Sequence, residues 1–352
     1  MTIGGFGRWM KKPNVQIESE TLPPSKIRGK IIPIDIMGIM YQYRFGPRKA
    51  VFRNINPFTE DPDELAADCK WFDMLISKLV KWIRHFGFIP LFVFDGKPRP
   101  LKIQKELRRR KEKENKVENR IQELKAKYAG KRSLVIPDSA KLELRKLRAG
   151  HHLVPRESAN RFKKFFQDLG VPTITVSGDA ERFCALYSAK HKVPAMSRDR
   201  DCFAFGTHSL IIDEVNYKAP DSQCNQWAFE IIRTNRLLAK LEMDYDNFVD
   251  LCIFAGTDYN DNIPKLSFGK GIPLIRKHKY LENFPMDVSK LNYVEVRKEF
   301  EQVDPESLIV EGSMEVDFDE SRMDAALEEY DLKEWKTELL RAHEVLGSYR
   351  LV

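Results

Sequence analysis

The chain has 352 residues, of which 42% are hydrophobic and 32% are charged, and its formal net charge is +7. This length allows one large domain or two ordinary ones, and the apolar content argues against a disordered chain. The longest apolar stretch, residues 86–94, is interrupted by Gly87 and Pro90 and is far shorter than the roughly 20 residues of a membrane helix. We therefore expect no membrane contact, and the start of the chain does not resemble a signal peptide. The basic charge favours polyanionic partners such as nucleic acid.

The cysteines are scattered along the chain and odd in number, and they form no Cys-x-x-Cys pair. They are Cys69, Cys184, Cys202, Cys224 and Cys252. This pattern argues against a disulfide framework and against a zinc site. We expect a protein that is not secreted and that works in a reducing, intracellular compartment.

Two short apolar runs, each ending in an acid, predict the first strands. They are residues 31–35, ending in Asp35, and residues 90–95, ending in Asp95. Between them, residues 63–86 have the apolar spacing of a helix with one buried face. Apolar strands separated by helices predict a mostly parallel sheet that is covered on both faces. In such sheets functional residues gather at the carboxyl ends of the strands, where both acids lie.

The segment from Lys97 to Arg132 differs in composition. It contains fifteen Lys or Arg residues against five Glu, and no aliphatic residue lies between Arg108 and Lys116. We expect a basic helix that projects from the body and packs along only part of its length. By itself, such a run is better explained as a solvated charged helix than as a binding site.

Globular character returns at about residue 156. The pattern predicts helices over residues 158–169, from about residue 179, and over 243–254, and strands over 173–176, 193–197 and 209–212. Residues after about 290 become more acidic. We predict an irregular tail there, with a final helix over residues 332–345.

Seven carboxylates lie at the ends of these predicted elements. They are Asp35, Asp95, Asp179, Glu181, Asp199, Asp201 and Asp258. Hard divalent cations prefer oxygen ligands, and two such ions can activate water and stabilise the leaving oxygen of a phosphodiester. Each acid alone has a simpler explanation: Asp179 and Glu181 fit the first turn of a helix, and Asp95 precedes a glycine in a turn. The metal-site hypothesis depends on the whole set.

Five motifs in order make the chain resemble the flap-endonuclease/XPG family of structure-specific 5′ nucleases. Ile34-Asp35 is followed by Tyr41, and Phe92-Val93-Phe94-Asp95-Gly96-Lys97-Pro98 comes next. The others are Asp179-x-Glu181 with Cys184-Ala185, Asp199-x-Asp201-Cys202-x-x-Phe205-Gly206, and the run Leu251 to Tyr259 that contains Asp258. The resemblance extends from the N-terminus to about residue 285.

The resemblance implies an α/β nuclease domain over residues 1–285, with a central, mostly parallel sheet flanked by helices (the PIN/flap-nuclease type). Residues 1–96 would form its N-terminal part, 97–155 a basic helical arch, 156–285 an internal part with a helix-two-turn-helix-like segment, and 286–352 a C-terminal extension. The seven acids would bind two Mg²⁺ ions, for which Mn²⁺ could substitute. Lys102 and Arg109, seven residues apart on one helix face, would contact the scissile phosphate. Further nucleic-acid contacts would come from Tyr41, Lys97, Arg108, Arg110, Lys265 and Lys270.

The chain also departs from the family pattern. Thr2 stands where the family has glycine, and Asp179 stands where it usually has Glu. Lys265 and Ser267 occupy the glycine positions of the loop that holds a monovalent cation. The positive charge of Lys265 could partly replace that ion, although a simple surface turn explains the loop nearly as well. The tail carries no sliding-clamp motif. We expect a divergent, monomeric member, from a large DNA virus or another fast-evolving lineage, that acts in the nucleus or at a viral replication site.

Three functions remain open from the sequence. The first is a metal-dependent endonuclease and 5′ exonuclease that cuts flapped or branched DNA in replication, repair or recombination. The second is a ribonuclease on the same scaffold, and the third is a non-catalytic nucleic-acid binder. The presence of all seven acids speaks against the third. The sequence does not separate DNA from RNA, because both substrates use the same metals and phosphate contacts.

Overall fold

The computed structural model describes residues 3–12, 15, 17–132, 135–151, 154–218 and 225–349. Within these ranges the side chains of residues 54, 103–111, 113, 217, 218 and 225 are not described.

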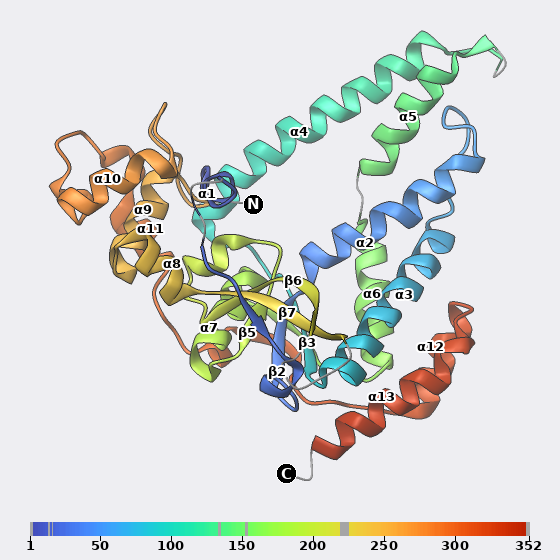
Figure 1. Cartoon of the computed structure of the whole chain (residues 1–352). Helices are drawn as coiled ribbons and strands as arrows, with labels where there is room; N and C mark the ends of the chain where they lie inside the picture. Colours follow the sequence, from blue (N-terminus) through green and yellow to red (C-terminus); the bar gives the residue numbers. More distant parts are fainter. Residues whose placement is uncertain are drawn as a thin grey trace.

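A sheet of eight strands forms the centre of the part of the chain that is described, in the order β1-β7-β6-β5-β2-β3-β4-β8 (Figure 1). The strands are β1 (Glu20–Leu22), β2 (Ile31–Asp35), β3 (Ile89–Phe94), β4 (Thr173–Val176), β5 (Pro194–Met196), β6 (Ser209–Lys218), β7 (Asn225–Arg233) and β8 (Ile309–Ser313). The five inner strands, β6 to β4 in this order, pair in parallel, whereas β7, β1 and β8 pair antiparallel. The predicted mostly parallel sheet is confirmed.

Helices cover both faces of this sheet (Figure 1). On one side lie α2 (Ile36–Val51), α3 (Glu64–Lys81), which continues into a π-helical turn η3 (Trp82–Phe86), and α6 (Arg156–Asp168). On the other side α7 (Ala180–His191) packs against β2, β3, β4 and β5. A further helical group surrounds α9 (Tyr245–Ala255) and consists of α1 (Phe6–Met10), α8 (Thr234–Leu241), α10 (Phe268–His278) and α11 (Tyr293–Glu299). The core between these layers is rich in Phe and Trp side chains.

Two helices project from the body as an antiparallel pair, α4 (Pro100–Lys127) and α5 (Asp138–Gly150) (Figure 1). They are joined through a small apolar cluster in which Ile121 and Leu124 of α4 pack against Leu144 of α5. At the base of the pair, the Arg48 guanidinium donates hydrogen bonds to the carbonyl oxygens at the end of α5, including that of Ala149 at 3.0 Å. The basic helix expected to project from the body is therefore present. The extent of its packing depends on the side chains of residues 103–111 and 113, which lie outside the described residues.

The C-terminal tail is more ordered than the sequence indicated, because the irregular stretch expected after residue 290 contains α11, β8 and α12 (Glu320–Glu329). The final helix is α13 (Lys336–Tyr349), somewhat later than predicted. Strand β8 was not recognisable because only Ile309 and Val310 are apolar and the strand is mostly exposed. It forms because β4 offers a free edge, a property of the assembled sheet.

No described helix combines the length and the apolar character that a membrane span requires. Cys69, Cys184, Cys202 and Cys252 are free thiols, and Cys224 lies outside the described residues.

Candidate metal and nucleic-acid site

The sheet brings the predicted acids to one edge. Asp35 ends β2, Asp95 follows β3, Asp179 precedes α7 after β4, and Asp199 follows β5. Because these four strands run parallel, their carboxyl ends share one side of the sheet. The remaining three acids come from the next turns of the chain: Glu181 in the first turn of α7, Asp201 just after Asp199, and Asp258 in the loop after α9.

Three of the carboxylates lie close enough to hold one cation. An oxygen of each of Asp95, Asp179 and Glu181 lies within 4.8 Å of the others. The Lys102 ammonium from the start of α4 lies at this cluster, 2.6 Å from Asp179, 3.4 Å from Asp258 and 3.9 Å from Glu181. The predicted phosphate ligand Lys102 is thus brought directly to the acids.

The ionisation of the acids reflects their crowding. Burial, and next the charge of Asp95, raises the pKa of Asp35 to about 7. Burial also raises the pKa values of Glu181 and Asp201 well above their usual range, with further contributions from Asp179 and Asp199 respectively. Without a cation, these groups resist becoming fully charged.

The pKa of the Lys102 ammonium is raised as well, which keeps this group charged. Burial alone would lower the pKa of its ammonium, but the carboxylates of Glu181, Asp179 and Asp258 outweigh it and raise the pKa. A single lysine cannot neutralise seven converging acids. The all-oxygen donor set and the raised carboxyl pKa values therefore fit a site for divalent cations.

Neighbouring groups that the sequence did not single out hold the acids in place. The Ser197 hydroxyl donates to Asp35 at 2.7 Å, and the Tyr259 hydroxyl donates to Asp179 at 2.8 Å. Such contacts orient carboxylates in metal sites. Ser197 and Tyr259 adjoin motif acids in the sequence, and this adjacency was the only signal that could have found them.

The start of the chain also reaches the site. The Ile3 backbone N–H donates to Asp201 at 2.8 Å, and the Gly4 N–H donates to the Gly256 carbonyl at 2.8 Å. A Cβ at Gly4 would lie 2.0 Å from the Ala255 oxygen, so this close approach requires glycine. Despite the departure at Thr2, which lies outside the described residues, Ile3 contacts one of the acids.

The predicted nucleic-acid ligands are distributed around this edge. Tyr41 on α2 is 47% exposed, and Lys97 is exposed in the loop before α4. Both are free to meet a substrate. The side chains of Arg108, Arg109 and Arg110 lie outside the described residues, although their backbone belongs to α4.

The loop before α10 carries the other two predicted ligands. Lys265 has a positive φ of 67°, a conformation that favours glycine. Its backbone oxygen accepts a hydrogen bond at 2.9 Å from the Lys270 ammonium. Among the described residues, the ammonium of Lys270 therefore meets a backbone oxygen of this loop. That the charge of Lys265 partly replaces a monovalent cation stays a prediction.

Comparison with known sequences identifies related families. A model of the XPG N-terminal domain matches residues 1–116, and a model of the XPG I-region matches residues 170–258, together more than half of the chain. Flap endonuclease 1 of Cryptosporidium muris is 28% identical over 285 residues, which is 77% of this chain and 56% of the relative. Flap endonuclease 1 of Mus musculus is 30% identical over 239 residues, 64% of this chain and 59% of the relative. The chain thus spans less than two thirds of the length of these relatives.

Solved structures share the fold. Flap endonuclease-1 from Methanococcus jannaschii superposes with a TM-score of 0.61 at 19% identity, covering 94% of this chain and 97% of that one. The catalytic core of Rad2 in complex with DNA substrate has a TM-score of 0.56 at 18% identity, covering 92% of this chain and 96% of the other.

Proposed function

The chain belongs to the flap-endonuclease/XPG family, and from this premise we propose that it is a divalent-metal-dependent nuclease that hydrolyses phosphodiester bonds in flapped or branched DNA. The observation that carries the proposal is the convergence of the motif acids and Lys102 at one edge of the sheet. We place this activity inside the cell, in DNA replication, repair or recombination.

In this proposal, Asp95, Asp179 and Glu181 hold one Mg²⁺, and the remaining acids complete a second ion site. The bound ions would supply an activated water and stabilise the leaving oxygen of the phosphodiester. The protein's own part is to orient the acids, through Ser197 and Tyr259, and to hold a positive charge, that of Lys102, beside the scissile phosphate.

The substrate is held by groups outside the acid cluster. Tyr41 offers a ring on which a base can stack, and the basic helix α4 offers charge to a single strand. Lys97, Arg108, Arg110, Lys265 and Lys270 contact phosphates, which positions the nucleic acid without reading its sequence.

The test uses purified protein and matched 5′-flap substrates made of DNA and of RNA. We expect the DNA flap to be cut in Mg²⁺ or Mn²⁺, bound but uncut in Ca²⁺, and uncut in EDTA. Asp95→Asn and Asp201→Asn should abolish cutting with little change in circular dichroism. Glu328→Gln, an exposed acid paired with Lys333, serves as the matched control. Cutting of RNA alone would favour the ribonuclease, and full activity in EDTA would overturn the metal mechanism.

A second experiment examines the form of the substrate. If a free 5′ end must pass beneath α4 and α5, a bulky protein attached to that end should block cutting of an otherwise identical flap. The same protein attached to the far end of the duplex is the control. Equal cutting of blocked and open flaps, or of featureless single strands, would refute the threading idea.

A further inference from the structure

A group of basic residues lies at the edge of the sheet opposite the carboxylates. Lys30 directly precedes β2, Lys192 lies between α7 and β5, and His208 directly precedes β6. Because these three strands run parallel, their starts share one edge of the sheet, and the acid cluster lies at the other edge. A pocket of about 320 Å³ lies there, which we call the amino-edge pocket. Neither the sequence motifs nor the proposed function uses it.

The amino-edge pocket combines an apolar floor with a basic rim. Its floor consists of buried side chains, namely Leu22, Ile27, Val193 and Ile231. Three exposed lysines line its rim, namely Lys26, Lys30 and Lys192. Its volume lies at the lower end of the range of pockets that hold small molecules, roughly 300–1,000 Å³.

The acid at this pocket does not neutralise the lysines. Among the described lining residues the acid is Glu20, whose carboxylate binds Arg233 at 2.6 Å and Arg236 at 3.2 Å. The hydrogen bond from Arg233 is the strongest influence on the pKa of Glu20 and lowers it, so this carboxylate is charged and already paired. The three lysines of the rim form no hydrogen bond or ion pair with any residue that the structure describes. The pocket therefore keeps an excess of positive charge.

His208 shows how closely these charges approach one another. Its Nε2 lies 2.8 Å from a nitrogen of the Arg233 guanidinium, which can only donate, so Nε2 accepts and the ring is neutral. Burial lowers the pKa of His208 most, and the charges of Arg233, Lys192 and Lys30 lower it further, whereas Glu20 acts in the opposite sense. Cations from separate strand starts thus act on one point of the pocket.

Ser209 adds a buried hydrogen-bonding group that is not used within the protein. The residue is only 1% exposed and lines the pocket. The hydrogen bonds that reach it, from the Thr207 and Ser188 hydroxyls, end on its backbone oxygen. Its own hydroxyl has no hydrogen-bond partner in the described part of the chain. Because a buried hydroxyl without a partner is unfavourable, Ser209 points to a polar ligand at this wall.

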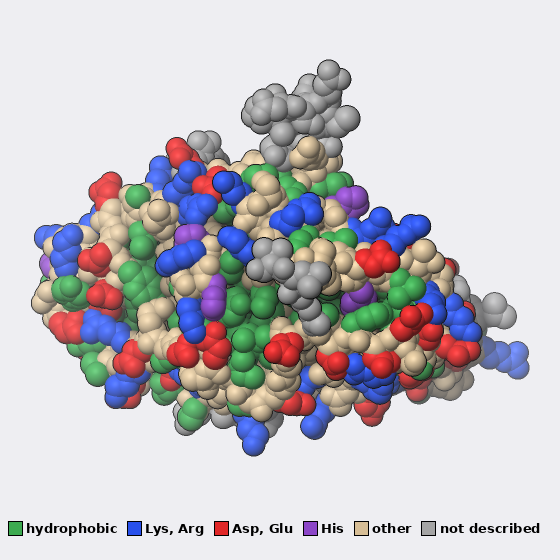
Figure 2. All heavy atoms as spheres, turned by 90° about the horizontal axis from the view of Figure 1, so that it is seen from below, with side chains coloured by type: hydrophobic (Ala, Val, Ile, Leu, Met, Phe, Trp, Pro, Cys, Tyr) green, Lys and Arg blue, Asp and Glu red, His purple; other side chains and the backbone are tan. Residues whose placement is uncertain are grey.

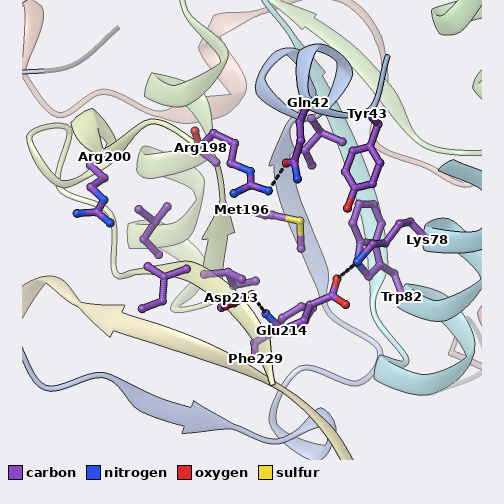
Figure 3. A pocket seen from close by; sticks show the side chains of 15 residues that line it. Gln42, Tyr43, Lys78, Trp82, Met196, Arg198, Arg200, Asp213, Glu214 and Phe229 are labelled. Carbon is purple, nitrogen blue, oxygen red and sulfur yellow. Dashed lines mark hydrogen bonds and ion pairs between the residues drawn. The ribbon is translucent and has the colours of Figure 1, made fainter. Parts of the chain in front are cut away.

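The pocket drawn in Figure 3 shows the contrasting situation. It lies between α2, α3 and the hairpin of β6 and β7, and charged groups line it too. There Lys78 binds Glu214 at 2.9 Å, and Arg198 donates to the Gln42 side chain. These charged groups have partners inside the protein, whereas the lysines of the amino-edge pocket do not.

A phosphate group matches the amino-edge pocket better than a carboxylate does. A carboxylate carries a single charge, and Glu20 already supplies one at this place. A phosphomonoester carries roughly 1.5 to 2 negative charges at neutral pH and has three strong acceptor oxygens. It can therefore accept from two lysines and from the Ser209 hydroxyl together, while the apolar floor receives the group attached to the phosphate.

We propose that the amino-edge pocket binds a phosphate dianion, either free phosphate or the phosphate of a small nucleotide, on Lys30, Lys192 and Ser209. This inference goes beyond the proposed nuclease function, because the pocket lies across the sheet from the carboxylates and needs neither these acids nor a metal ion. The ligand stabilises the folded protein, since its binding groups come together only when the starts of β2, β5 and β6 are assembled.

The experiment measures binding to the full chain by titration calorimetry. It is done in EDTA at pH 8 and at one ionic strength, so that metal ions and salt do not change between samples. The probes are inorganic phosphate, adenosine monophosphate and adenosine. We expect both phosphates to bind, and adenosine to bind at least about tenfold more weakly than its monophosphate. Tighter binding of the monophosphate than of phosphate identifies a nucleotide as the ligand, and equal binding identifies phosphate itself.

Variants assign the binding to this pocket. Lys30→Gln and Lys192→Gln should each weaken binding of the phosphates about tenfold, the size of one lost charge-assisted hydrogen bond. Phosphate should raise the thermal unfolding midpoint of the wild-type protein and have little effect on that of the double variant. Lys164→Gln removes one charge from an exposed pair with Asp168 and is the control, which should bind phosphate as the wild type does.

The outcomes separate this inference from the proposed function. Wild-type affinity for phosphate in both lysine variants, or equal affinity for adenosine and its monophosphate, would overturn the phosphate pocket. If the variants bind flapped DNA more weakly in Ca²⁺ but bind the monophosphate normally, this edge belongs to the nucleic-acid surface and the inference is also wrong. Both variants should still cut the flap in Mg²⁺ at the wild-type rate, so the nuclease is judged by cutting and the pocket by the titration.

Discussion

At the scale of single residues, the placement of Lys102 has the greatest consequence. Its ammonium contacts Asp179 at 2.6 Å, so in this structure it serves as a counter-ion to the acids. A phosphate that arrives with metal ions would compete for the same ammonium. Lys102 can therefore contribute to the reaction more strongly than to the binding of substrate.

The first prediction follows from this position. Lys102→Gln should lower the single-turnover rate by more than it weakens binding, and Arg109→Gln should behave alike if it contacts the same phosphate. Lys97→Gln is the matched control, since Lys97 is exposed in the loop before α4 and should affect binding alone. Rates and dissociation constants are measured on one flap substrate. If all three variants lose only binding affinity, Lys102 attracts the nucleic acid through its positive charge and has no separate part in the reaction.

The second prediction concerns Tyr259. Its hydroxyl donates to Asp179 at 2.8 Å, and its burial raises its pKa, so the phenol stays neutral and keeps its proton. Tyr259→Phe should raise the Mg²⁺ concentration needed for half-maximal rate by about 10–100-fold, as expected for a group that orients a metal ligand. Tyr245→Phe removes a hydroxyl that donates to the Ala204 carbonyl and is the control. An unchanged Mg²⁺ requirement would show that Tyr259 only stabilises the fold.

At the scale of elements, the loop before α10 contains Lys265, which has a positive φ and whose backbone oxygen contacts the ammonium of Lys270. Lys265 takes a conformation that glycine adopts more easily, and Lys270 donates to the Lys265 carbonyl. The family resemblance implies a monovalent cation in this loop, and an ammonium at that oxygen would take its place. The loop should therefore depend little on potassium.

The third prediction compares binding of a flap substrate in potassium and in lithium salts at one ionic strength, since ionic strength by itself changes affinity steeply. We expect similar dissociation constants for the wild-type protein. Lys270→Ala frees the carbonyl oxygen and should make binding weaker in lithium than in potassium. If the wild-type protein binds the flap much more weakly in lithium than in potassium, the ion site is intact and neither lysine replaces the ion.

At the scale of the whole molecule, charge is distributed unevenly. The face seen in Figure 2 shows basic and acidic side chains interspersed, with hydrophobic side chains between them. The acids that line the carboxyl edge of the sheet are instead concentrated and mostly buried. Concentrated negative charge makes the stability of the metal-free protein depend on pH.

The fourth prediction gives the sign of this dependence. A carboxyl group whose pKa is higher in the folded protein stabilises the fold below its unfolded pKa and loses this contribution as the pH rises through the folded value. For Asp35 the window runs from 3.8 to about 7. In EDTA, the free energy of unfolding in urea should therefore be lower at pH 8 than at pH 5.

Metal and mutation provide the controls for this measurement. Mg²⁺ should reduce the difference between pH 5 and pH 8, because it stabilises the ionised acids. Asp95→Asn should reduce it too, since the charge of Asp95 is, after burial, the strongest influence that raises the pKa of Asp35. Glu328→Gln should leave it unchanged. A free energy that rises towards pH 8 in EDTA would contradict the crowding of the acids.

Local sequence patterns predicted the parallel strands, the long basic helix and the seven candidate acids, because apolar runs, helical spacing and short motifs depend on neighbouring residues alone. They did not predict strand β8 or the contacts of Lys102 and Tyr259 with Asp179, which join residues far apart in the chain. The arginines of the turn after β5 show the same limit. In the sequence Arg198 and Arg200 are two charges that alternate with Asp199 and Asp201. That they line a pocket built from α2, α3, β6 and β7 follows from the packing of distant elements. The physical reason is that burial and pairing depend on which distant elements pack together.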